Sequence, residues 1–346
     1  MLMVIFGAGA SFDSSATHPL GDPRGNRPPL ANSLFDDRKE FHGARNEFPQ
    51  IHALIPQLLP HGKRSIEQTL QKYSDQAAGD PVRKQQLLAV RYYLQGIFGF
   101  VVQAWLGEIG TFTNYDALLE QIRHHRKGPE PVCLVTFNYD TLLEHALAKQ
   151  FNRTFDVLDD YVSSPEYKVF KIHGSQNWGR RVEGVPTMLF RGNRDPRGQP
   201  GVMIENVERI SPSSVFEVYD TAARSGNFSG PPLYPAVAIP VATKTDSTFE
   251  CPAHHLGQLA ELIPKVTKLL TIGWRGEEQH FLGMLRKLKT GVAITAVAES
   301  VQAAEQTIGL IRNVRQGAGY AKGWAEFSSV VRDGSLEDFL AAIPTL

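Results

Sequence analysis

The sequence has few cysteines and no surplus of charge of either sign. Its 346 residues include two cysteines, and 36 basic side chains balance 36 acidic ones. Cys133 and Cys251 lie far apart in the chain, which excludes a four-cysteine zinc module and a disulfide framework and favours two buried thiols. Because a chain without net charge has no general attraction for phosphate backbones, we expect no direct nucleic-acid binding.

Long apolar runs are also missing. The N-terminal apolar run ends at Phe6 and has no basic flank, unlike a signal peptide. No uninterrupted apolar stretch approaches the ~20 residues that span a bilayer. We therefore expect no membrane contact and a cytoplasmic location. The pairs His124–His125 and His254–His255 stand in polar surroundings that indicate solvated loops, without a carboxylate at ligand spacing, so we expect no metal.

Short apolar runs that alternate with helical patterns make up much of the chain. Buried strands are expected at residues 2–6, 131–136, 168–172, 269–272 and 291–297. Strands of this kind between helices predict an α/β fold with a doubly wound, parallel, Rossmann-like sheet. We expect one domain, 1–346, whose Rossmann-like core comprises residues 1–35, 129–175 and 233–346.

Two segments interrupt this predicted core. Residues 36–128 have helical periodicity and are expected to form a helical insertion, with a capping-box pattern at Ser65–Gln68 and with Asn114 or Asp116 capping a later helix. Residues 176–232 are rich in Gly, Pro, Asn and Arg and predict an irregular loop segment. The apolar stretch at 236–241 contains a proline, which indicates a strand end or a sheet edge.

Four expected strands end in glycine-rich or polar junctions. These junctions are Gly7–Ser11, Asn138–Asp140, His173–Ser175 and Gly273–Arg275. Ligands of open parallel sheets bind beyond the carboxyl ends of the strands. We therefore expect the four junctions to line a single crevice.

The first junction is a glycine turn. Gly7 and Gly9 permit a tight turn and the close approach of a pyrophosphate to free N–H groups of the next helix. Phe12 stands where the usual fingerprint of dinucleotide-binding folds has its third glycine. By itself this motif is equally consistent with a strand–helix turn that binds no ligand.

Asn138 and His173 are the candidate catalytic residues. The Asn138 amide can donate and accept at once, and so orient a water molecule or a ribose hydroxyl. A helix N-cap is its alternative role, but Asp140 is better placed for that. His173 ends an expected strand, and imidazole is the natural general base near neutral pH.

Several motifs together resemble the sirtuin family. Their order and spacing are similar to the family's glycine turn, TxNxD element and HGS element in Phe6–Ser11, Thr136–Asp140 and Lys171–Ser175. Further stretches resemble elements of the prokaryotic sirtuin-like subfamily found in antiphage systems, namely Arg27–Leu30, Ser65–Leu70 and Leu270–Trp274. The similarity spans most of the chain.

The resemblance implies an enzyme that hydrolyses NAD⁺ at the nicotinamide–ribose bond, as an antiphage effector that depletes NAD⁺. Two cysteines in place of four, and the sequence Phe-Asp-Ser-Ser after Ser11 in place of GIPDFR, both disfavour protein deacylation. Antiphage relatives often act beside a partner. The resemblance therefore implies a homo-oligomer controlled by a HerA-type hexameric ATPase or a phage-derived activator.

The same comparison implies which residues bind NAD⁺. The expected contacts are Gly7, Ala8, Gly9, Ala10, Ser11, Asp140, Gly174, Gly273, Trp274 and Glu299. Glu299 is assigned to the adenosine ribose, although an acid at a helix N-terminus explains it equally well. Two other functions stay open: an NAD-dependent protein deacylase or ADP-ribosyltransferase, and a non-catalytic regulatory module that binds NAD⁺ or ADP-ribose.

Overall fold

A six-stranded parallel sheet organises the protein, as seen in a computed structural model that describes residues 1–15, 17, 26–59, 65–110, 112–126, 128–184, 200–219, 233–243, 249–317 and 319–341. The strand order is β3–β2–β1–β7–β8–β9, and every neighbouring pair is parallel. The strands are β1 Leu2–Phe6, β2 Val132–Thr136, β3 Tyr167–Lys171, β7 Lys268–Ile272, β8 Ala293–Ala298 and β9 Ala321–Ala325. The order runs outward in both directions from β1 and β7, which is the Rossmann-like arrangement, so the predicted fold class is confirmed.

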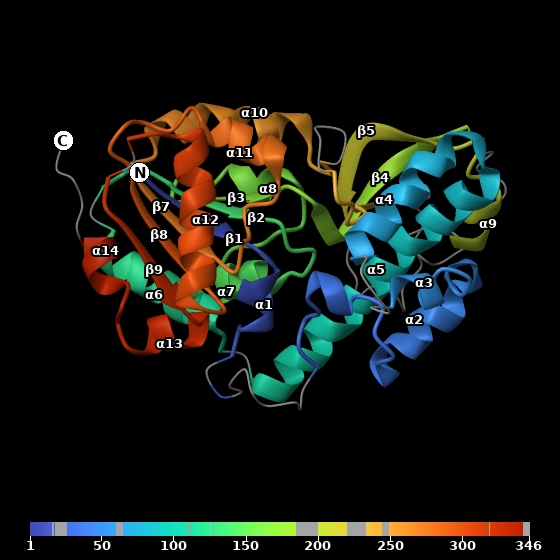
Figure 1. The fold of residues 1–346 in the computed structure, drawn as a ribbon, viewed down its shortest axis with the longest axis horizontal. Coiled ribbons are helices and arrows are strands. Elements are labelled where there is room, and N and C mark those ends of the chain that lie inside the picture. The colour runs from blue at the N-terminus through green and yellow to red at the C-terminus, as the bar shows by residue number, and fades with distance from the viewer. Residues whose placement is uncertain are drawn as a thin grey trace.

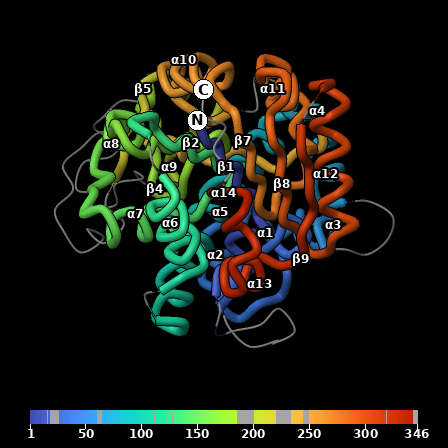
Figure 2. The backbone as a smooth tube through the Cα atoms, turned by 90° about the vertical axis from the view of Figure 1, so that its left-hand side faces the viewer, coloured from blue at the N-terminus to red at the C-terminus, as the bar shows by residue number. Residues whose placement is uncertain are grey.

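Helices cover both faces of this sheet. Figure 2 shows α6 (Asn114–His125) and α7 (Leu142–Phe151) on one side, with α11 (Gln279–Leu285) and α12 (Val301–Val314) on the other. Since both faces are covered, β2 and β7 are buried along their whole length, which explains why their sequences are mostly apolar. The remaining helices of this part are α1 Ala8–Phe12, α8 Asp159–Val162, α10 Ala253–Leu262, η8 Ile263–Lys265, α13 Phe327–Arg332 and α14 Glu337–Ala341.

A second body, which we call the helical lobe, comprises residues 31–59 and 65–110 and has its own apolar core. It lies on the right in Figure 1. The Ser65 capping box is confirmed, since the Ser65 hydroxyl accepts from Gln68 N and the Gln68 side chain accepts from Ser65 N. Its elements are η1 Ala31–Ser33, η2 Lys39–Phe41, α2 His42–Glu47, η3 Pro49–Ile51, α3 Ile55–Leu58, α4 Ile66–Gln76, η4 Ala77–Gly79 and α5 Pro81–Ile109.

The long helix α5 is the centre of the lobe. Within the described residues it is the one helix whose length and composition would suffice to cross a membrane, and most of its apolar stretch is buried inside the protein. The sequence of α5 contains no long uninterrupted apolar run, because polar residues such as Gln95 break it. Gln95 is itself buried and donates to Trp178 O at 2.8 Å, so α5 is attached to the rest of the protein by polar contacts as well.

A small antiparallel sheet adjoins the lobe, with the order β5–β4–β6. The prediction that residues 176–232 are irregular is wrong for their described part, which contains most of β4 (Gly174–Glu183), α9 (Pro200–Glu205) and β5 (Ser211–Val218). An antiparallel edge strand keeps one side in solvent, so its sequence need not be apolar, and β5 is indeed only half-buried. The third strand, β6 (Leu233–Val237), lies at an edge of this sheet and overlaps the predicted stretch 236–241 only at its last two residues.

Packing departs from the predicted core boundaries at two elements. β6 belongs to the small sheet, although residues 233–346 were assigned to the core, and α6 packs into the core of the large sheet, although it was assigned to the insertion. The N-cap of α6 is Thr113, whose hydroxyl accepts from Asp116 N. Asn114 and Asp116 are therefore not the caps, and Asp116 supplies the reciprocal half of a capping box.

The two histidine pairs lie on helices, which corrects the expectation of loops. His124 and His125 end α6, and His254 and His255 are in the first turn of α10. His255 is completely buried, since α10 packs its ring against Trp178 at 6.0 Å between centroids.

Candidate functional site

A cavity of about 550 Å³ lies at the carboxyl ends of β1 and β7, where the strand order reverses. This is the position at which open α/β sheets bind their ligands. Both the sheet part and the helical lobe contribute walls. Ten of the twelve predicted site residues line it: Gly7, Ala8, Gly9, Ser11, Asn138, Asp140, His173, Gly273, Trp274 and Glu299.

Backbone contacts hold three strand ends together at the cavity floor. Gly7 N donates to Ile272 O at 3.0 Å, Gly9 N donates to Gly273 O at 3.2 Å, and Gly273 N donates to Val297 O at 2.8 Å. A Cβ on Gly7 would lie 2.4 Å from Gly273 O, and one on Gly273 would lie 2.2 Å from Ala10 N. Gly273 also has φ +60°. These glycines are required because two backbones touch there.

This packing changes the role expected for the glycine turn. Gly9 N donates to Gly273 O, and Ala10 N donates to Gly7 O at 2.9 Å. Neither N–H is free to face a pyrophosphate, so that expectation is wrong for these two groups. Ala10 is buried and does not line the cavity.

Asn138 follows β2 and is oriented by the turn. Its side-chain nitrogen donates to Gly7 O and to Ser11 Oγ, each at 2.9 Å. Because a carbonyl oxygen can only accept, the amide nitrogen must face the turn. The amide oxygen receives no hydrogen bond from the part of the chain that the structure describes. It is therefore the group of Asn138 that can accept from a ligand in the cavity.

A buried ion pair supports the loop that carries Asn138. Lys171 Nζ lies 2.9 Å from Glu144 Oε1 and donates to Asp140 O at 2.5 Å. Asp140 Oδ1 accepts from Leu142 N at 3.1 Å, but the N-cap of α7 is Thr141 and not the predicted Asp140, which stands one residue before it. Burial raises the pKa of the Asp140 carboxyl, while the Lys171 ammonium and a hydrogen bond from Ser11 act in the opposite direction.

His173 follows β3 and is 7% exposed. Its ring packs edge-on against Phe137, with 5.0 Å between centroids. On its other side Phe137 stacks on Trp274 at 5.7 Å and 5°. Phe137 thus brings together the ends of β2, β3 and β7. The backbone also fixes His173, whose carbonyl accepts from Ala238 N at 2.9 Å.

Gly174 is the second predicted site residue that does not line the cavity. It has φ +78°, and a Cβ there would lie 1.9 Å from Ala236 O. It begins β4 and pairs with Val237 of β6. In the structure, Gly174 turns the chain from the large sheet into the small one.

The cavity wall is acidic, which the sequence reasoning largely missed. Among the described residues that line it, Arg275 is the one lysine or arginine. Seven carboxylates line it: Asp13, Glu67, Asp140, Glu277, Glu278, Glu299 and Glu326. Only Asp140 and Glu299 were predicted. Glu277, Glu278 and Glu326 follow the ends of β7 and β9, so the strand-end rule would have found them had the junction after β7 been extended and β9 been recognised.

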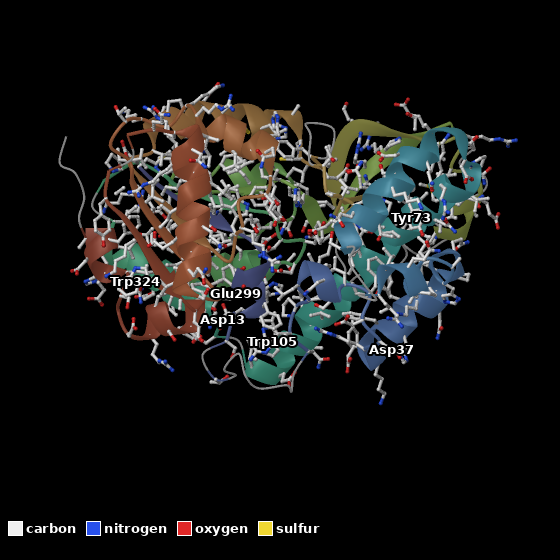
Figure 3. The ribbon with its side chains drawn as sticks, in the orientation of Figure 1. Asp13, Asp37, Tyr73, Trp105, Glu299 and Trp324 are labelled. Carbon is white, nitrogen blue, oxygen red and sulfur yellow. The ribbon has the colours of Figure 1, made fainter. Side chains whose placement is uncertain are left out.

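Asp13 and Glu299 mark the end of the cavity that α1 and the β8–α12 junction form (Figure 3). Asp13 is 4% exposed, and its carboxylate accepts from Ser328 N at 3.1 Å. Burial raises its pKa, which the hydrogen bonds from Ser328 oppose. Glu299 is exposed, as expected for an acid at a helix N-terminus.

Both cysteines are buried free thiols, as predicted, and burial raises the pKa of each. In the described ranges, no group of three or more His, Cys, Asp or Glu side chains is placed to hold a metal ion. No protein-family model and no curated protein matches the chain. Arguments about function therefore depend on the geometry of the cavity.

Proposed function

We propose that this protein is an NAD⁺ glycohydrolase of sirtuin-like type, which releases nicotinamide and ADP-ribose. One observation carries the proposal. Asn138 and His173 come from different strand ends, and both line one cavity at the strand-order reversal. An amide and an imidazole together can orient and deprotonate a nucleophile at a sugar carbon.

The proposed reaction is attack of water on the anomeric carbon of the nicotinamide ribose. The bond from that carbon to the pyridinium nitrogen breaks, neutral nicotinamide leaves with the electron pair, and the water proton is lost. The Asn138 oxygen accepts a hydrogen bond from the water or a ribose hydroxyl. His173 accepts the proton. The transition state has oxocarbenium character, as in glycoside hydrolysis.

The acidic wall supports this chemistry. NAD⁺ carries a cationic ring, and the sugar becomes cationic in the transition state. The carboxylates of the wall stabilise both positive centres, while they disfavour the two phosphates of NAD⁺, for which Arg275 is the arginine among the described lining residues. Because hydrolysis removes the positive ring, the product ADP-ribose is more negative than the substrate and is bound less favourably by the same wall.

An assay of nicotinamide release from NAD⁺ tests the proposal. Enzyme and NAD⁺ are mixed at comparable concentrations, so that a slow basal rate is measured even without an activating partner. We expect nicotinamide and ADP-ribose in equal amounts. An acetylated peptide in a parallel reaction distinguishes deacylation, which would transfer the acetyl group and make release depend on the peptide. NAD⁺ binding without any product would leave the regulatory module as the function.

A further inference from the structure

A tyrosine from α6 lies behind the catalytic amide. The Tyr115 hydroxyl is 2.9 Å from Ser11 Oγ and 3.3 Å from the Asn138 side-chain nitrogen. Tyr115 is 1% exposed and is not among the described residues that line the cavity. Its ring packs between Phe6, at 5.1 Å between centroids, and Phe327, at 5.8 Å. Its hydroxyl group is therefore held rigidly.

The direction of each hydrogen bond in this cluster follows from the groups present. The Asn138 nitrogen can only donate, and it shares its two protons among Gly7 O, Ser11 Oγ and, at the longer distance of 3.3 Å, the Tyr115 oxygen. The Tyr115 proton therefore has Ser11 Oγ as its acceptor. Ser11 Oγ then accepts from both Tyr115 and Asn138. Ser11 also lowers the pKa of the nearby Asp140 carboxyl, against the effect of burial. The Tyr115 hydroxyl is then satisfied, as buried polar groups require.

We propose that Tyr115 is a positioning residue, which acts with Ser11 to hold the Asn138 nitrogen against the glycine turn and the Asn138 oxygen towards the cavity. This inference rests on the proposed function, in which that oxygen orients the attacking water. The cluster joins groups that are 104 and 127 residues apart in the chain, so it ties α6, α1 and the β2–α7 loop to a single geometry.

The same cluster assigns a different role to Ser11. Ser11 was expected to contact NAD⁺, but both acceptor positions of its hydroxyl are used inside the protein. The hydroxyl orients Asn138, while the backbone of Ser11 still forms part of the cavity wall.

The test is Tyr115→Phe, which keeps the ring packing and removes the hydroxyl. We expect kcat for nicotinamide release to fall about three- to tenfold, the effect of losing one buried hydrogen bond that orients a reacting group. KM for NAD⁺ and the Kd of ADP-ribose should stay within about twofold, because the cavity wall is unchanged. Ser11→Ala should also lower kcat while KM for NAD⁺ and the Kd of ADP-ribose stay nearly constant, and its fall in kcat should be larger. The double variant should lose no more than Ser11→Ala alone, because both act through one amide.

Tyr167→Phe is the matched control. Tyr167 is also buried in the core of the large sheet, and its hydroxyl has no hydrogen-bond partner among the described residues. All its kinetic constants should equal those of the unmodified protein.

The outcomes separate the two proposals. If the unmodified protein releases no nicotinamide, the proposed function is wrong. If it is active and Tyr115→Phe keeps full kcat, or loses kcat and ADP-ribose affinity together, the role of Tyr115 is wrong. If Tyr115→Phe does not fold, Ser11→Ala with Tyr115 intact decides by the same split between kcat and KM.

Discussion

The sheet part and the helical lobe contribute different chemistry to the shared cavity. From the sheet come the polar strand ends, with Asn138 and His173 among them. The lobe supplies an apolar wall that includes Leu34 and Phe98. Among the described lobe residues that line the cavity, Glu67 is the charged one. Under the proposed function, the sheet part holds the reacting groups and the lobe defines the shape of the space. Substitutions in the two parts should therefore affect different kinetic constants.

The largest effect is expected at the sheet. His173→Ala and Asn138→Ala should each lower the rate of NAD⁺ cleavage by about 10²–10⁴-fold, the usual contribution of a positioned acid–base group. Circular dichroism should show an unchanged fold. His52→Ala, at an exposed histidine of the lobe, is the control and should keep full activity. Near-normal turnover by folded His173→Ala would refute the assignment.

An intermediate effect is expected on the free energy of unfolding when the pH is lowered, and it again arises in the sheet part. Burial lowers the pKa of His255 to about 4, the neighbouring His254 adds to this, and the contact with Leu158 O opposes it. Its Nε2–H donates to Leu158 O at 3.1 Å, while Nδ1 is buried without a partner in the described residues, so a second proton has no acceptor. The folded protein therefore binds this proton more weakly than the unfolded chain.

The contribution of neutral His255 to the free energy of unfolding should then be fully present above pH 6.5 and decline as the pH falls towards 4. At pH 5 the loss is on the order of 2 kcal/mol. Urea unfolding at pH 7 and pH 5 measures it, and His255→Gln should remove this part of the difference. His254→Gln, at the half-exposed neighbour, should leave most of it. An unchanged pH dependence in His255→Gln would contradict the explanation.

The smallest effect is expected at the lobe. Phe98 lies on α5 and packs edge-on against Tyr139, with 5.2 Å between centroids. Phe98→Leu should raise KM for NAD⁺ about fivefold and leave kcat within about twofold, since an apolar wall binds substrate and transition state equally. Steady-state kinetics on NAD⁺ measure both constants. A fall in kcat with constant KM would show that the lobe also takes part in the chemistry.

The strands of the large sheet were predictable wherever both of their faces are covered. Residues 3–6 and 268–272 are buried throughout, and such strands have mostly apolar sequences. The edge strand β9, with the sequence AKGWA, was missed because solvent reaches one side of it and its pattern is mixed. Strand β5 was missed for the same reason, whereas β4 was missed because its buried half contains polar residues such as Ser175 and Gln176.

The site was predictable to the extent that it follows strand ends. Asn138, His173 and Gly273 were found because each directly follows a recognisable strand. Tyr115 was not, because on an amphipathic helix a tyrosine is indistinguishable from an ordinary core residue. Its contact with Ser11 spans 104 residues, and no local pattern encodes a contact of that separation. Glu67 was missed for the same reason, since the lobe brings it to the cavity through tertiary packing.

The contact between Gly7 and Gly273 has a consequence for how such sequences are classified. Because a Cβ at either position would overlap a neighbouring backbone, folding alone forbids larger residues there. A lineage that gave up its chemistry would still retain both glycines, while the amide and imidazole positions would be free to drift. The glycine signature therefore reports architecture, and under the proposed function the identities at 138 and 173 are what would distinguish an active chain from an inactive one.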